Sequence, residues 1–219
     1  MTTRVLVTGF EPFAGSPVNP SQRLVEELAA RPPSGVELAT AVLPVSYERA
    51  PDELRAAVRA AEPDAVVCFG QADGRAGISV ERFALNLDDP ANVDNDGTSS
   101  AAPVDGEGPA AYRSTLPVDE IVAALRAAGI PAAASRDAGG FLCNHVFYAL
   151  MRLLKLERPE ATGGFVHVPL LPEQALETAV ASMPLDVLVQ AAAIVVEVVS
   201  APVGAGTIRI PSTRIGDRS

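Results

Sequence analysis

Residues 65–70 read AVVCFG, a short apolar run that ends at a glycine. The run is too short for a core helix, and its β-branched residues favour a strand covered on both faces, as in a central parallel sheet. Residues 5–8, VLVT, have the same character. Between the two runs, Leu24, Val25 and Leu28 recur at helical spacing. This alternation of strand and helix predicts an α/β fold with a largely parallel, doubly covered sheet.

The same rhythm continues along the chain. Further strands are expected at residues 36–42, 131–134 and 164–168, and extended chain is expected over 74–87. Helices are expected from the cap residue Asn19 to the stop at Pro32, and over residues 48–61, 117–128, 143–156, 174–181 and 186–200. Residues 88–115 are polar and rich in glycine and proline, which predicts a long surface excursion. Because no internal repeat or long linker interrupts the pattern, residues 1–219 are expected to form a single domain.

Charge and composition exclude several function classes. The net charge is −10, from 17 Lys+Arg and 27 Asp+Glu without a basic run, so nucleic acid is not an expected partner. The longest apolar stretch, 185–203, contains Asp186 and Glu197, which favours a buried helix over a membrane anchor. Two cysteines, Cys68 and Cys143, lie far apart in the sequence, and no signal peptide is recognisable. These features predict a reduced, cytoplasmic location.

Three motifs that would indicate a metal or a nucleotide are incomplete. Residues 92–97, NVDNDG, resemble the start of a calcium loop, but the twelfth position is Pro103 instead of a bidentate carboxylate. Residues 9–15 have glycines at P-loop spacing but no lysine after them. The two histidines of the chain cannot build a structural zinc cluster. We therefore expect no metal and no cofactor.

The two cysteines stand in different surroundings. Cys68 lies within a run that is apolar on both faces, which is typical of an inert buried cysteine. Cys143 follows a glycine turn at residues 139–140 and stands at the start of an expected helix. Unpaired N–H groups at such a position favour a thiolate and could bind an oxyanion. Cys143 is therefore either a nucleophile or a buried structural cysteine.

A thiol nucleophile needs a base, and the chain has two histidines. His145 lies two positions after Cys143 on the same expected helix, about 200° around its axis, so the two side chains diverge. It is expected to pack or to hydrogen-bond. His167 lies near the carboxyl end of an expected strand, where open α/β sheets present catalytic groups. His167 is the better candidate base, and a satisfied core histidine is the alternative.

Four blocks of sequence carry a family resemblance. They are TGFEPF at 8–13 with NPS at 19–21, GQADGR at 70–75 with ER at 81–82, AGGFLCNH at 138–145, and FVHVP at 165–169 with LPEQ at 171–174. In this order they resemble the pyroglutamyl peptidase I family, also called pyrrolidone carboxyl peptidases. The resemblance implies a cysteine peptidase that removes N-terminal pyroglutamate from peptides without a cofactor. It also implies a three-layer α/β/α sandwich with a mixed, mostly parallel sheet, and a homotetramer.

The resemblance also implies roles for individual residues. Cys143 is the expected nucleophile, His167 the base, and Glu81 the carboxylate that orients the imidazole, a role that suits a group accepting the second ring N–H. A flat, neutral pyroglutamyl ring calls for apolar faces and a few polar groups. The substrate-binding residues implied are Phe10, Phe13, Asn19, Gln71, Phe141 and Leu142.

The chain departs from the family pattern at a few positions. Ala91 stands where the family typically has an arginine, Gly140 and Val45 stand where threonine is found, and Asp73 replaces a glycine. Arg75 and Arg82 are the nearest candidates to take over from the missing arginine. Two alternatives to a pyroglutamyl peptidase follow: a catalytically weak homologue that binds pyroglutamyl groups, and an amide hydrolase of different specificity.

Overall fold

The computed structural model describes residues 2–201, and its centre is a six-stranded sheet with the order β2-β1-β3-β8-β4-β7. The strands are β1 (Thr3–Phe10), β2 (Val36–Leu43), β3 (Ala65–Gln71), β4 (Ile78–Glu81), β7 (Ala132–Ser135) and β8 (Thr162–Val168). Neighbouring strands are parallel except β4 and β8, which are antiparallel. The sheet is therefore mixed and mostly parallel, as the family resemblance implied.

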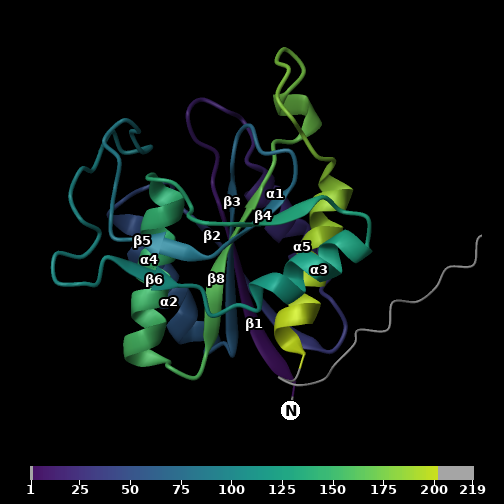
Figure 1. Cartoon of the computed structure of the whole chain (residues 1–219), viewed down its shortest axis with the longest axis horizontal. Helices are drawn as coiled ribbons and strands as arrows, with labels where there is room; N and C mark the ends of the chain where they lie inside the picture. Colours follow the sequence, from purple (N-terminus) through teal and green to yellow (C-terminus); the bar gives the residue numbers. More distant parts are fainter. Residues whose placement is uncertain (1, 202–219) are drawn as a thin grey trace, which may run out of the picture.

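Helices cover both faces of this sheet (Figure 1). Helices α1 (Pro20–Ala30), α3 (Val118–Ala127) and α5 (Leu185–Ser200) pack on one face, and α2 (Arg49–Ala61) and α4 (Leu142–Glu157) pack on the other. The expected three-layer α/β/α sandwich is confirmed.

Side-chain alternation along the strands divides the core into two halves. In β1, Val5 and Val7 belong to the cluster under α1, α3 and α5, whereas Leu6 belongs to the cluster under α2 and α4. The apolar run in β3 divides in the same way, with Val67 on the first side and Cys68 on the second. These two strands thus contribute to two hydrophobic layers, which explains the continuous apolar runs VLV at 5–7 and AVVCF at 65–69.

The apolar segment that begins at Leu185 forms α5, which lies against the sheet. Ala192, Val195 and Val196 are fully buried there. Among residues 2–201, no helix combines the length and apolar character needed to cross a membrane.

Most of residues 88–115 are exposed, as expected for a surface excursion, but Asp88, Asp94 and Ser114 in this segment are buried. Hydrogen bonding explains the burial of Asp94: it accepts the N–H of Thr98 within the loop and the N–H of the distant Tyr47, which attaches the loop NVDNDG to the rest of the protein. Within the same stretch, β6 (Ala111–Arg113) pairs with β5 (Phe83–Leu85) in a small antiparallel sheet.

The prediction of a helix over residues 174–181 is wrong. The chain forms only a short 3₁₀ turn, Pro172–Gln174, and continues as a loop that Met183 closes by donating its N–H to the Leu170 carbonyl. Leu176 in this loop is 81 % exposed, so no neighbouring surface is available to bury an apolar helix face.

Candidate active site

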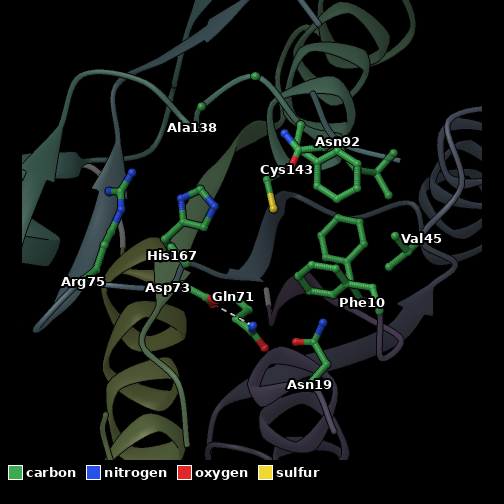
Figure 2. A pocket seen from close by; sticks show the side chains of 16 residues that line it. Phe10, Asn19, Val45, Gln71, Asp73, Arg75, Asn92, Ala138, Cys143 and His167 are labelled. Atoms are coloured by element: carbon green, nitrogen blue, oxygen red, sulfur yellow. Dashed lines mark hydrogen bonds between the residues drawn. The ribbon is translucent and has the colours of Figure 1, made fainter. Parts of the chain in front are cut away.

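A cavity of about 440 Å³ opens at the carboxyl ends of β1, β3 and β8. Phe10, Gln71 and His167, which stand at or near these strand ends, line it together with Cys143 from the start of α4. Figure 2 shows Phe10 and Val45 on one side of Cys143, and His167 and Arg75 on the other. The cavity therefore has an apolar side and a polar, charged side, with the thiol between them.

Glycines bring the Cys143 thiol into this position. Gly139 has a φ of +83°, which favours glycine, in the turn that leads into α4. A Cβ on Gly70 would lie 2.9 Å from Cys143 Sγ and 2.7 Å from Phe165 Cζ. Glycine at the end of β3 is therefore required for the thiol to reach the sheet.

The start of α4 has no side-chain cap. Phe141 occupies the cap position and makes no hydrogen bond to the first turn, which also contains no acidic residue. The first N–H groups of the helix consequently lack the usual partner, and they lie beside Cys143 at the cavity. An anionic oxygen formed at this point would meet N–H donors and the positive end of the helix dipole.

His167 is paired with a buried carboxylate. In the antiparallel pairing of β4 and β8, His167 lies opposite Ser79, so Glu81 two residues further along β4 shares the same face of the sheet. Glu81 is fully buried, and its Oε1 is 2.8 Å from His167 Nδ1. Because a carboxylate only accepts, Nδ1 carries the proton in this bond. In the neutral ring Nε2 keeps its lone pair and can accept a proton.

Burial sets the protonation of both groups. It lowers the pKa of His167, although the hydrogen bond that His167 donates to Glu81 opposes the effect. It also raises the pKa of Cys143 to about 12, with a further contribution from the charge of Glu81. Burial therefore opposes the helix start, which was expected to favour a thiolate. A neutral thiol beside a neutral imidazole can react only if the imidazole removes the proton during attack.

Aromatic side chains form the apolar side of the cavity. The rings of Phe13 and Phe141 are tilted against each other with centroids 6.1 Å apart. Phe10 packs on Phe165 with centroids 6.3 Å apart, and Leu142 completes the wall. Such faces suit a small, flat ring without charge.

Amide side chains border the cavity at its polar edge. Asn19 Oδ1 caps α1 by accepting the N–H of Ser21, and Asn19 Nδ2 donates to the Glu11 carbonyl, so one amide hydrogen of Asn19 remains. Gln71 Oε1 accepts from Gln174 Nε2 at 3.1 Å. Gln71 and Asn19 are thus held in fixed orientations at the cavity wall.

Nearly all the residues predicted for the site meet at this cavity. Those lining it are Phe10, Phe13, Asn19, Gln71, Phe141, Leu142, Cys143 and His167. Glu81 lies behind His167 and does not line it. Among the positions that depart from the family, Asp73, Val45 and Gly140 line the cavity, whereas Ala91 does not and is exposed.

Gly140 has a structural explanation. A Cβ at this position would lie 2.7 Å from Asp89 Cβ, and the Gly140 carbonyl accepts the N–H of Asp89. The segment around Asp89 therefore docks directly on the turn before α4. Asn92, a cavity residue that sequence reasoning missed, comes from this docked segment.

His145 is partly buried and pairs with a second carboxylate, the buried Asp88. Its Nδ1 lies 2.9 Å from Asp88 Oδ2, and its ring makes an edge contact with Tyr47. The prediction that His145 packs and hydrogen-bonds is confirmed. The neighbouring Asn144, also missed from the sequence, is fully buried and donates to the carbonyls of Leu85 and Leu87.

The described residues contain no group of three or more His, Cys, Asp and Glu side chains arranged to hold a metal ion. The carboxylates of the suspected calcium loop serve the protein itself, since Asp94 also accepts the N–H of Asp96.

Comparison with known proteins agrees with the residue-level resemblance. The family model described as pyroglutamyl peptidase matches residues 3–201. The pyrrolidone-carboxylate peptidase of Streptomyces coelicolor is 50% identical over 183 residues, covering 83% of this chain and 85% of the relative. That of Gloeobacter violaceus is 50% identical over 197 residues, covering 89% and 96%. The crystal structure of Bacillus amyloliquefaciens pyroglutamyl peptidase I matches with a TM-score of 0.87 and 38% identity, covering 91% of this chain and 96% of that one.

The matched region contains the cavity, the buried Glu81–His167 pair and Cys143. From the sequence blocks, the fold and these matches together, the chain belongs to the pyroglutamyl peptidase family.

Proposed function

We propose that this protein is a cysteine peptidase that removes N-terminal pyroglutamate from peptides, with Cys143 as nucleophile, His167 as base and Glu81 as the orienting carboxylate. The observation that carries the proposal is the 2.8 Å hydrogen bond between buried Glu81 and His167, in a cavity that His167 lines together with Cys143. The family to which the chain belongs supports the same chemistry.

The reaction begins with a neutral thiol and a neutral imidazole. His167 Nε2 takes the thiol proton while Cys143 Sγ attacks the carbonyl carbon that joins pyroglutamate to the next residue. Glu81 stabilises the imidazolium that forms. The N–H groups at the start of α4 stabilise the oxyanion of the tetrahedral intermediate.

The remaining steps regenerate the site. His167 gives its proton to the departing amine, the carbon–nitrogen bond breaks, and a thioester on Cys143 remains. Water then loses a proton to His167 as it attacks the thioester, and pyroglutamate and the free thiol are released. No cofactor takes part in these steps.

The cavity suits the pyroglutamyl ring. Phe13 and Phe141 supply faces for its flat, neutral body, while Asn19 and Gln71 supply hydrogen-bonding groups at the edge for the lactam N–H and C=O. Phe10 and Leu142 complete the proposed substrate-binding set.

The protein is proposed to act in the cytoplasm as a single-domain subunit of a homotetramer, with no nucleic acid or membrane as partner. Free thiols at Cys68 and Cys143 support a reducing compartment. The family match from residue 3 to residue 201 supports one domain. Light scattering coupled to gel filtration tests the assembly, and a mass other than four times 22.7 kDa would contradict the tetramer.

Turnover of a pyroglutamyl amide reporter, measured beside its prolyl and glutamyl counterparts, tests the activity. We expect hydrolysis of the pyroglutamyl amide alone, and none with Cys143→Ala. Equal hydrolysis of another amide would indicate an amide hydrolase of different specificity. Binding of pyroglutamyl peptides without turnover would indicate a catalytically weak homologue.

A further inference from the structure

Arg75 shares a carboxylate oxygen with the candidate base. Its Nη1 lies 2.9 Å from Glu81 Oε1, and this same oxygen is 2.8 Å from His167 Nδ1. The other oxygen of Glu81, Oε2, is buried and has no hydrogen-bond partner among residues 2–201. The orientation of this fully buried carboxylate therefore depends on two donors that meet at one atom.

The position of Arg75 differs from that of the next arginine in the chain. Arg75 lies in the connection between β3 and β4, lines the cavity, and has a side chain 30 % exposed. Within residues 2–201 it is the only Arg or Lys that lines the cavity. Arg82 directly follows Glu81 but pairs with the exposed Asp119 and lies outside the cavity lining.

A buried carboxylate is costly unless it is paired with a cation or with several donors. Neutral His167 offers Glu81 one N–H, and Arg75 supplies both a second N–H and a full positive charge. Loss of the guanidinium would leave Glu81 held by the imidazole alone. The imidazole would then lose a fixed partner for Nδ1 and, with it, the orientation of Nε2 towards the thiol.

We propose that Arg75 is a positioning residue for the catalytic pair, which holds the Glu81 carboxylate against His167 and tunes the imidazole as a proton acceptor. The inference deepens the proposed function and rests on it. Arg75 acts through Glu81, and no contact with substrate is assigned to it.

The charged groups around His167 determine the direction in which its pKa should change when Arg75 is replaced. Glu81 on β4 and Asp137 before α4 favour the imidazolium, whereas Arg75 and burial oppose it and lower the pKa of His167. Arg75 also lowers the pKa of Cys143, against the larger effects of burial and Glu81 that raise it. Among residues 2–201, Asp73 is the only carboxylate that lines the cavity itself. Removal of the positive charge of Arg75 should therefore raise the pKa of both His167 and Cys143.

Arg75→Gln, Arg75→Lys and the matched control Arg82→Gln test this role. In Arg75→Gln we expect kcat for a pyroglutamyl reporter to fall about tenfold or more with little change in KM. The acid limb of kcat/KM should move up by about half a pH unit or more. Arg75→Lys keeps the positive charge, so the acid limb of its kcat/KM profile should lie at the same pH as in the parent protein. Arg82→Gln should have the same kinetics and pH profile as the parent protein.

Alkylation of Cys143 by iodoacetamide measures the same effect without a substrate. The pH dependence of the alkylation rate should move to higher pH in Arg75→Gln and should be unchanged in Arg82→Gln. Unchanged alkylation and kinetic profiles in a folded Arg75→Gln would overturn the proposal, as would a change confined to KM. If Arg75→Gln does not fold, Arg75→Lys provides the test. Kinetic and alkylation pH profiles that match those of the parent protein would support a role for the positive charge, and a shifted acid limb of kcat/KM would contradict it. A shifted alkylation profile in a protein that hydrolyses no pyroglutamyl reporter would reject the proposed function and leave this inference standing.

Discussion

The structure contains two histidine–carboxylate pairs, one with a fully buried carboxylate and a buried histidine, the other with a buried carboxylate and a partly buried histidine. His167 Nδ1 is 2.8 Å from Glu81, and His145 Nδ1 is 2.9 Å from Asp88. The two distances are similar, yet of the two histidines only His167 lines the cavity that contains Cys143. His145 faces away from it, towards Tyr47, because two helical positions separate it from the cysteine. A paired histidine is thus a structural element unless the fold also exposes its free nitrogen to the reacting atoms.

The backbone around each pair explains the difference. His167 and Glu81 come from adjacent strands, which place both side chains on one face at the carboxyl end of the sheet. His145 and Asp88 join a helix to a loop, so their bond fastens the loop to the helix. One pair is positioned to move protons, and the other is positioned to hold a segment in place.

Replacement of the histidines should give the largest effect. His167→Ala removes the proton acceptor, so we expect kcat/KM to fall by about a thousandfold. His145→Ala leaves Asp88 buried without its partner, and we expect a loss of about 1–3 kcal/mol of stability with activity within about tenfold of the parent. Steady-state kinetics and denaturant unfolding measure the two quantities. Equal activity losses in folded variants would leave the base unidentified.

Replacement of the two carboxylates should also have different effects, on kcat for Glu81 and on stability for Asp88. Glu81→Gln keeps the shape but removes the charge that stabilises the imidazolium, and we expect kcat to fall by about a hundredfold. Asp88→Asn should cost mainly stability, on the order of 1 kcal/mol. Kinetics with both variants at matched folded fractions provide the check. A loss of kcat in Asp88→Asn as large as in Glu81→Gln would mean that the second pair acts in the reaction.

The two cysteines should differ in alkylation. Burial raises the pKa of each to about 12, so direct alkylation as thiolate is slow near neutral pH and becomes faster as pH rises. Cys143 has an imidazole beside it and access to the cavity, whereas Cys68 is fully buried. We expect Cys143 to react about tenfold faster or more, measured by peptide mapping. Earlier labelling of Cys68 would remove the nucleophile assignment.

The smallest effect is expected at Ala91, which lies three residues after Asp88 and donates its N–H to Asp89. If an arginine here stabilises the oxyanion, Ala91→Arg should raise kcat with little change in KM. Because Ala91 is exposed and does not line the cavity, we expect only about a twofold to fivefold gain. A folded variant no faster than the parent would show that the missing arginine is not a deficit.

The parts of the site that depend on short stretches of sequence could be predicted. A glycine turn followed by helical spacing predicted that Cys143 stands at a helix start, and α4 begins at Leu142. An apolar run ending near His167 predicted its place at a strand end, and β8 ends at Val168. Asn19 was identified as a cap because side-chain capping is a short-range interaction.

Other parts depend on long-range contacts that no local pattern records. The place of Glu81 beside His167 follows from the antiparallel pairing of β4 and β8, and only family resemblance pointed to it. Asp88 looked like a solvated loop residue because its partner His145 lies 57 positions away. The helix expected over 174–181 failed for the same reason, since its apolar face had no neighbour to cover it.

Asn144 ties the short strand β5 to the turn of α4 that contains Cys143. Its Oδ1 accepts the N–H of Leu85, and its Nδ2 donates to the Leu85 carbonyl. An edge strand of three residues would ordinarily exchange its amide hydrogens with solvent quickly. Because Asn144 is fully buried, the Leu85 amide can open only when the first turn of α4 is disrupted. The hydrogen-exchange rate of the Leu85 amide therefore reports how often the first turn of α4, which contains the nucleophile Cys143, unfolds locally.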